Sequence, residues 1–141
     1  MPLNSVSEEV GLRMGDWRQV AKRIFPELQP EVEAAESPMS LWLEIVYKFD
    51  TAYETPIDED FIRRVYEYAD WCLQQEGGED AREHLPTCVV TCFWEHIPTV
   101  KAAREDMPRW FTLEEVIANQ HFFKYLLTDD EFEEVKNLYA R

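Results

Sequence analysis

The sequence predicts an all-α fold, a compact bundle of five to seven helices in antiparallel and orthogonal packing. Amphipathic segments with helical spacing recur along the chain, and prolines or capping residues bound most of them. No stretch combines alternating polarity with a hairpin signal such as Asn-Gly. The chain has 141 residues, 45% of them hydrophobic, which suits one domain with a sizeable core. We therefore expect a single helical domain over residues 1–141, with residues 1–15 as a loosely ordered N-terminal segment.

An amphipathic stripe predicts the first helix, between a capping aspartate, Asp16, and a terminating proline, Pro26. Its apolar residues follow the helical spacing i, i+3, i+4, i+7 and i+8: Trp17, Val20, Ala21, Ile24 and Phe25. Residues 30–36 are acidic and carry few apolar side chains, so we expect about two turns of solvent-facing helix there.

Two longer helices follow, each opened by a hydroxyl residue and a proline. Ser37 with Pro38 predicts a helix that runs to about Tyr53, and Thr55 with Pro56 predicts another that runs to about residue 75. Each has an apolar stripe that should face the core: Trp42, Ile45, Val46, Phe49 and Tyr53 in the first, Phe61, Val65, Tyr68, Ala69 and Cys72 in the second.

Residues 85–97, LPTCVVTCFWEHI, are apolar around most of a helical circumference. Pro86 suits a first helical turn, and Pro98 ends the run because the residue before a proline is pushed out of the helical region. The run is shorter than the roughly 20 apolar residues that a membrane span needs. We therefore expect a central helix around which the rest of the bundle packs.

Two capping boxes open the C-terminal helices. Thr112 with Glu115 predicts a helix to about residue 127, and Thr128 with Glu131 predicts the last helix. Thr99 is expected to cap a short helix before them.

The chain is strongly acidic, with 29 acidic and 14 basic residues and a formal net charge of −15. Binding to nucleic-acid phosphates depends on lysine and arginine, and anionic membranes attract basic segments. The charge therefore argues against nucleic-acid and membrane partners and suits a basic protein partner.

The N-terminal sequence MPLNSVSEEVGLR lacks the basic and apolar blocks of a secretion signal. The three cysteines are an odd number in a chain of this size, which favours reduced thiols over a disulfide framework. Both observations predict a cytoplasmic location.

Cys88, Cys92 and His96 follow one another at i+4 spacing and are weak candidates for a soft metal, with Cys72 or His84 as a fourth ligand. One helix would then supply three ligands, which is unusual for a structural zinc site. Cysteine is also commonly buried as a small apolar residue. We therefore predict core packing here, with no metal and no cofactor.

Evidence for catalysis is weak. Glu95 borders an apolar helix, where partial burial would raise its pKa and suit a general acid, but it also fits the solvated edge of that helix. His121 is expected to be a hydrogen-bonded core residue. The sequence contains no phosphate-binding loop, HExxH or GxSxG motif. We predict a protein that is not an enzyme, the alternative being a small hydrolase or metal-binding protein.

Acidic groups beside aromatic rings are the strongest candidates for a functional surface, because charge steers association while buried rings hold a complex. Trp71 lies roughly 130° from the apolar stripe of its helix and is expected to be exposed. The predicted partner-binding residues are Tyr53, Asp58, Glu59, Asp60, Trp71 and Trp110. Two alternatives remain: the charge serves solubility alone, or the chain self-associates through Trp71 and Trp110.

Three segments resemble a family of small bacterial all-helical proteins catalogued as a domain of unknown function: FPEL at 25–28, SLWLEIVYKFD at 40–50 and VVTCFWEHIP at 89–98. The resemblance spans about residues 20–140 and implies a helical fold. Similar small acidic helical proteins include immunity proteins that neutralise toxins. The resemblance thus implies an acidic cytoplasmic protein-binding domain of immunity type, of which a DNA mimic is a variant, and it assigns no catalytic residues.

Overall fold

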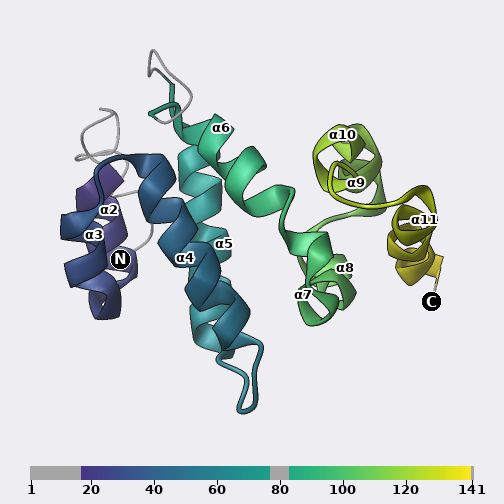
Figure 1. Ribbon diagram of the computed structural model, residues 1–141, viewed down its shortest axis with the longest axis horizontal. Coiled ribbons are helices and arrows are strands. Elements are labelled where there is room, and N and C mark those ends of the chain that lie inside the picture. Colours follow the sequence, from purple (N-terminus) through teal and green to yellow (C-terminus); the bar gives the residue numbers. More distant parts are fainter. Residues whose placement is uncertain (1–16, 77–82, 141) are drawn as a thin grey trace. The chain divides into compact units, whose positions relative to one another are not determined.

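The computed structural model describes residues 17–76 and 83–140 (Figure 1). These residues form ten α-helices, α2 to α11, together with short 3-10 and π segments, and they contain no β-strand. The all-α prediction is confirmed. The helices outnumber the expected five to seven because several expected helices are interrupted. The expected cap Asp16 and the segment 1–15 lie outside the described residues.

The chain divides into two compact units, Met1–Val89 and Val90–Arg141, called here the N-terminal unit and the C-terminal unit. In the N-terminal unit, α2 (Trp17–Ile24) packs against α5, and α3 (Gln29–Ala34) packs against α4. A 3-10 turn, η2 (Pro26–Leu28), joins α2 to α3. The apolar stripe predicted for the first helix is buried, as expected for an amphipathic helix on a core.

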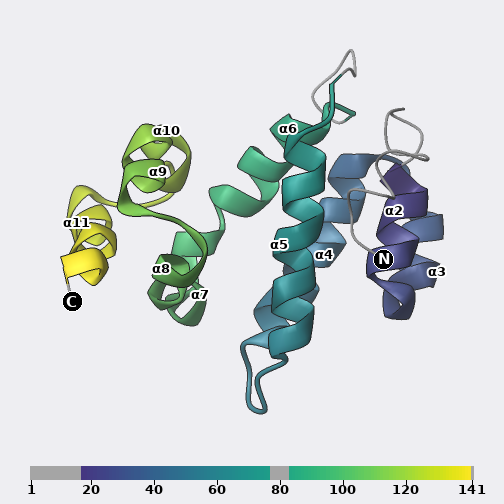
Figure 2. The same ribbon diagram turned by 180° about the vertical axis from the view of Figure 1, so that it is seen from behind.

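Two 15-residue helices, α4 (Pro38–Ala52) and α5 (Glu59–Leu73), form the body of the N-terminal unit. Figure 1 shows α4 in front of α5, and Figure 2 shows the same pair from behind. The predicted start of α4 is confirmed: the Ser37 hydroxyl accepts a hydrogen bond from the Ser40 amide at 3.2 Å.

The second helix starts later than the sequence predicted. Asp58 caps α5 by accepting the Phe61 amide at 3.1 Å, and the Asp58 amide donates to the Ala52 carbonyl at 2.8 Å. Residues 53–58 therefore form a turn that contains a cis Thr55–Pro56 bond, and Pro56 is not the first helical residue.

A stack of three rings lies at the centre of the N-terminal unit. The Tyr68 ring lies 5.5 Å from Trp42 and 5.9 Å from Trp71, measured between centroids, and its hydroxyl donates to the Trp17 carbonyl. Trp71 is only 2% exposed, so the prediction of an exposed ring is wrong. Three helices (α2, α4 and α6) pack on α5, which makes its buried face wider than one stripe.

The expected central helix is not one regular helix. It consists of α6 (Leu85–Cys88), a π-helical segment (Val89–Trp94) and a 3-10 turn (Ile97–Thr99). The Glu95 amide donates to the Val90 carbonyl, the i to i+5 spacing of a π-helix. The division between the two units falls inside this segment, so its buried residues belong to two units.

The C-terminal unit consists of short helices. They are α7 (Lys101–Glu105), α8 (Met107–Trp110), α9 (Leu113–Ala118), α10 (Gln120–Phe123) and α11 (Asp129–Asn137), followed by a 3-10 turn (Leu138–Ala140). Both capping boxes are confirmed: the Thr112 hydroxyl accepts the Glu115 amide, and the Thr128 hydroxyl accepts the Glu131 amide, each at 3.1 Å.

Two expectations in this unit are corrected. The helix expected from Thr112 onwards breaks at Asn119, whose backbone leaves the helical region between α9 and α10. Thr99 does not cap α7, because it closes the preceding 3-10 turn and Val100 is the capping residue.

The core of the C-terminal unit is built on an aromatic cluster. Trp94 stacks on Phe123 at 5.2 Å, and Phe111 meets Phe123 edge to face at 5.0 Å. Trp94 is half-buried, whereas Phe123 is fully buried.

In the described part of the chain, no helix has the length and apolar character of a membrane span.

Candidate functional site

The end of the N-terminal unit where α4 turns into α5 gathers exposed acidic side chains. Glu54, Asp58, Glu59 and Asp60, called here the acidic turn, are all exposed. Ile57 lies among them in the sequence and is 53% exposed. The turn thus presents carboxylates together with an uncovered apolar side chain.

Tyr53, another predicted partner-binding residue, lies at the start of this turn. Its ring is half-buried and packs edge to face on Phe49, with 5.2 Å between centroids. Three predicted binding residues (Asp58, Glu59 and Asp60) therefore lie at the same end of the unit as Tyr53.

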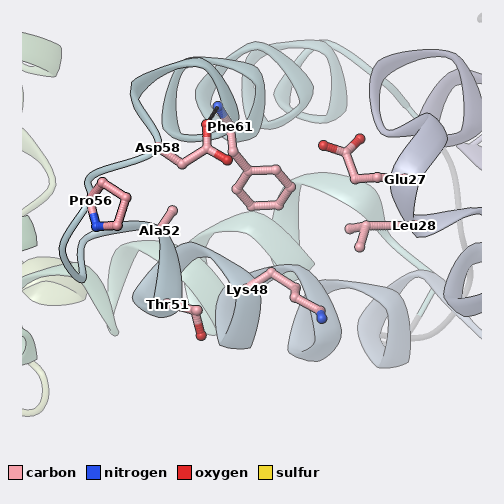
Figure 3. A pocket seen from close by; sticks show the side chains of 8 residues that line it. All are labelled: Glu27, Leu28, Lys48, Thr51, Ala52, Pro56, Asp58 and Phe61. Carbon is pink, nitrogen blue, oxygen red and sulfur yellow. Dashed lines mark hydrogen bonds between the residues drawn. The ribbon is translucent and has the colours of Figure 1, made fainter.

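A pocket of about 420 Å³ opens beside the acidic turn (Figure 3). Four of its lining residues are apolar and four are polar: Leu28, Ala52, Pro56 and Phe61, and Glu27, Lys48, Thr51 and Asp58. Figure 3 shows the Phe61 ring between Asp58 and Glu27, with Lys48 on the other side of the pocket. Phe61 is 5% exposed and forms part of the floor.

Most polar groups of the pocket already have partners within the protein. Arg64 donates to both carboxylate oxygens of Glu27, at 2.8 and 2.5 Å, and this hydrogen bonding lowers the pKa of Glu27. The Thr51 hydroxyl donates to the Tyr47 carbonyl at 3.1 Å. Lys48 is half-buried and makes no ion pair with the residues that the structure describes.

These contacts suit binding better than acid–base catalysis. Glu27 remains ionised at neutral pH and both of its oxygens accept from Arg64, so it is poorly placed to donate a proton. One oxygen of Asp58 accepts from the Phe61 amide as a helix cap. The pocket therefore offers an apolar floor and fixed charges at its rim.

Asp60 has a structural role that the sequence did not reveal. It accepts from Arg63 at 2.5 Å and from Arg64 at 2.8 Å, and these hydrogen bonds lower its pKa. Two guanidinium groups thus offset the charge of Asp60 within its own helix.

The two predicted tryptophans do not join the acidic turn. Trp71 is buried in the ring stack. Trp110 belongs to the C-terminal unit, where it is half-buried, its indole N–H donates to Asp106 at 3.1 Å, and the Arg109 guanidinium lies over its ring.

The weak metal candidates lie in different units, Cys88 in the N-terminal one and Cys92 and His96 in the C-terminal one. All three cysteines of the chain are free thiols, and burial raises the pKa of both Cys72 and Cys92. Among residues 17–76 and 83–140, no group of three or more His, Cys, Asp or Glu side chains is arranged to hold a metal ion.

The two catalytic candidates differ from each other. Partial burial raises the pKa of Glu95, as expected for a carboxyl at the edge of an apolar segment. His121 is exposed and lies against Phe122, so the prediction of a core histidine is wrong. The break at Asn119 ends the regular helix on which that prediction rested.

Sequence reasoning missed most of the pocket. Glu27 and Leu28 come from η2, Lys48 and Thr51 from α4, and Phe61 from α5. No local pattern links these segments. The sequence did contain a pattern that indicates a second surface, on the exposed face of α4. Leu43 and Tyr47 are apolar, lie four residues apart and fall outside the stripe that faces the core.

Comparison of the chain with protein-family models, with curated proteins and with solved structures finds no match.

Proposed function

We propose that this protein binds a basic protein partner in the cytoplasm, without catalysis, and that the acidic turn is the centre of the contact surface. The main support for this proposal is that most of the negative charge lies in the N-terminal unit. Residues 1–89 contain 19 acidic and 8 basic residues, a formal charge of −11, whereas residues 90–141 contain 10 acidic and 6 basic residues, a charge of −4.

The charge of the N-terminal unit would act first on the rate of encounter. A concentrated field steers an oppositely charged protein to its docking surface and weakens as salt is added. Ile57 and Tyr53 would then supply apolar contact area beside the carboxylates.

The carboxylates of the turn do not contribute equally. Arg63 and Arg64 already neutralise Asp60, so its removal would disturb α5 more than the partner surface. Glu54 and Asp58 form no ion pair with a described basic side chain, and Glu59 is exposed in the first turn of α5. We assign the partner-facing role to Glu54, Asp58 and Glu59.

An immunity role is the form of this function that fits the charge best. An inhibitor that covers the basic surface of a toxin needs fast association and a rigid scaffold. The ring stack between α4 and α5 provides such a scaffold. The partner would then be toxic when produced alone and harmless when produced together with this chain.

The test starts with capture of partners from a lysate of the producing cells at low salt, followed by elution at high salt. The captured protein is then measured against a triple variant, Glu54→Gln, Asp58→Asn and Glu59→Gln. Asparagine caps a helix as well as aspartate does, so α5 keeps its cap. We expect the association rate constant at low salt to fall about tenfold, with a weaker salt dependence.

A matched control changes two glutamates and one aspartate of the C-terminal unit: Glu105→Gln, Glu114→Gln and Asp130→Asn. All three are exposed and form no ion pair with the residues described. Equal losses in both triple variants would show that overall charge, and not the acidic turn, drives association. For the immunity role, a partner that leaves growth unaffected when produced alone would contradict the proposal.

A further inference from the structure

The solvent-facing side of α4 carries an apolar stripe. Leu43 and Tyr47 lie four residues apart, one helical turn, and are 60% and 66% exposed. Figure 1 shows α4 in front of α5, with no other labelled helix of the N-terminal unit in front of it. Two exposed apolar side chains one turn apart on the same helix form a contiguous surface that a partner can cover. We call Leu43 and Tyr47 the α4 stripe.

Acidic groups follow the α4 stripe along the same side of the helix. Glu44 and Asp50 lie within about 60° of Tyr47 around the helix, and Glu54 lies in the turn that follows the end of α4 at Ala52. Lys48, which lines the pocket, directly follows Tyr47 and is therefore rotated about 100° from it around the helix. The negative end of the helix dipole lies at the same end as Glu54. Cations are therefore favoured at the C-terminal end of α4, towards the acidic turn.

We propose that the α4 stripe docks a basic amphipathic helix of the partner. The inference rests on the function proposed above and specifies the partner's chemistry. Apolar side chains of that helix pack on Leu43 and Tyr47, while lysines or arginines one to three turns away meet Glu54 and the acidic turn. This is the helix-on-surface mode of recognition, in which apolar residues at i and i+4 give register and flanking charges give orientation.

Charge complementarity selects this occupant over a second copy of the chain. Two copies meeting through α4 would bring two units of charge −11 together. Like charges opposed across an interface weaken it. A basic helix removes the same apolar surface from water and gains attraction where a second copy meets repulsion.

The test uses the full chain and two synthetic peptides. The first peptide has two leucines four residues apart, with lysines one to three turns away on both sides. The second has serine in place of both leucines, so its charge is the same. We expect the first peptide to bind about tenfold more tightly. Burying roughly one apolar side chain of the peptide gives enough free energy for a tenfold lower dissociation constant.

Two double variants test whether the tenfold ratio between the peptides depends on the α4 stripe. Leu43→Ser with Tyr47→Ser should abolish the tenfold ratio between the peptides. The matched control is Tyr125→Ser with Leu126→Ser, which removes the same residue types, 70% and 57% exposed, from the C-terminal unit. The control should retain the ratio.

Failure of this inference is distinguishable from failure of the proposed function. A ratio that survives in the Leu43/Tyr47 variant, or disappears in the Tyr125/Leu126 control, overturns the inference. The proposed function would still stand if the triple variant at Glu54, Asp58 and Glu59 weakened binding of both peptides equally. It would fail as well if that variant bound both peptides unchanged.

Two other occupants have their own signatures. If a second copy covered the α4 stripe, light scattering would give the mass of a dimer, and the Leu43/Tyr47 variant would give that of a monomer. If another segment of the chain covered it, the same variant would lower the free energy of unfolding, which exposed substitutions leave nearly unchanged. Either result overturns the inference.

Discussion

The two units of this protein use similar residues to build different structures. In the N-terminal unit, α4 and α5 are each 15 residues long, and a stack of buried rings lies between them. In the C-terminal unit, no described α-helix exceeds nine residues, and the stacking tryptophan, Trp94, is half-buried. The N-terminal unit also carries most of the negative charge.

The difference shows how helix length governs what a surface can do. A long helix can bury one full side and leave a continuous opposite side for contact, as α4 does with Leu43 and Tyr47. Short helices depend more on caps and tertiary contacts, because isolated helices below about 12 residues are marginal. This is why we propose the N-terminal unit as the platform for a partner.

The largest test of this comparison removes one stacking ring from each unit. Trp42→Ala should destabilise the protein by about 3–5 kcal/mol, because Trp42 is fully buried against Tyr68. Trp94→Ala should cost less, about 1–3 kcal/mol, because Trp94 is half-exposed. Urea unfolding followed by circular dichroism gives both values.

Amide hydrogen exchange on the same two variants shows whether the units behave separately. We expect Trp42→Ala to accelerate exchange in α4 and α5, and Trp94→Ala to accelerate exchange in α7 to α11. Equal acceleration across both units in either variant would contradict a division into separate cooperative units.

A smaller test compares helix caps. Ser37→Ala at α4 and Thr128→Ala at α11 each remove a hydroxyl that accepts a backbone amide, which typically costs about 1 kcal/mol. Faster exchange should extend over a larger part of α11 than of α4, because α11 has only nine residues. Thr128→Ser retains the cap and should behave as the wild type; equal fraying of both helices would contradict the length argument.

The smallest expected effect is a pH dependence in the N-terminal unit. The hydrogen bonds from Arg64 lower the pKa of Glu27 below its usual range, so their interaction stabilises the fold at neutral pH and is lost as pH falls through the lowered pKa. Glu27→Gln should reduce the free energy of unfolding by about 1 kcal/mol or less at neutral pH, and the difference should vanish in acid.

Urea unfolding at neutral and acid pH measures the Glu27 effect. Glu36→Gln is the control, since Glu36 is exposed and forms no ion pair with the residues described. A Glu27 difference that persists unchanged in acid would mean that the side chain contributes by packing and not by its charge.

The sequence predicted those features that depend on neighbouring residues. The caps at Ser37, Thr112 and Thr128 were predictable because a hydroxyl and an amide three residues on form a local unit. Trp71 was misplaced because its burial depends on three helices that pack on α5 from distant parts of the sequence.

The candidate site shows the same limit. The acidic residues of the turn were evident from sequence, but the engagement of Asp60 by two arginines depends on side-chain geometry. The pocket unites Glu27, Lys48 and Phe61 from separate elements, and no spacing in the sequence links them. The division at Val89 also falls within an apolar run with no linker composition to mark it.

The most direct measurement of the central claim is a titration of the ¹⁵N-labelled full chain with the leucine-containing basic peptide, followed by amide chemical shifts at low and high salt. We predict that the first and largest shifts occur in α4 and in the acidic turn, and that salt reduces them. Shifts concentrated in the C-terminal unit, or spread evenly over both units, would contradict it.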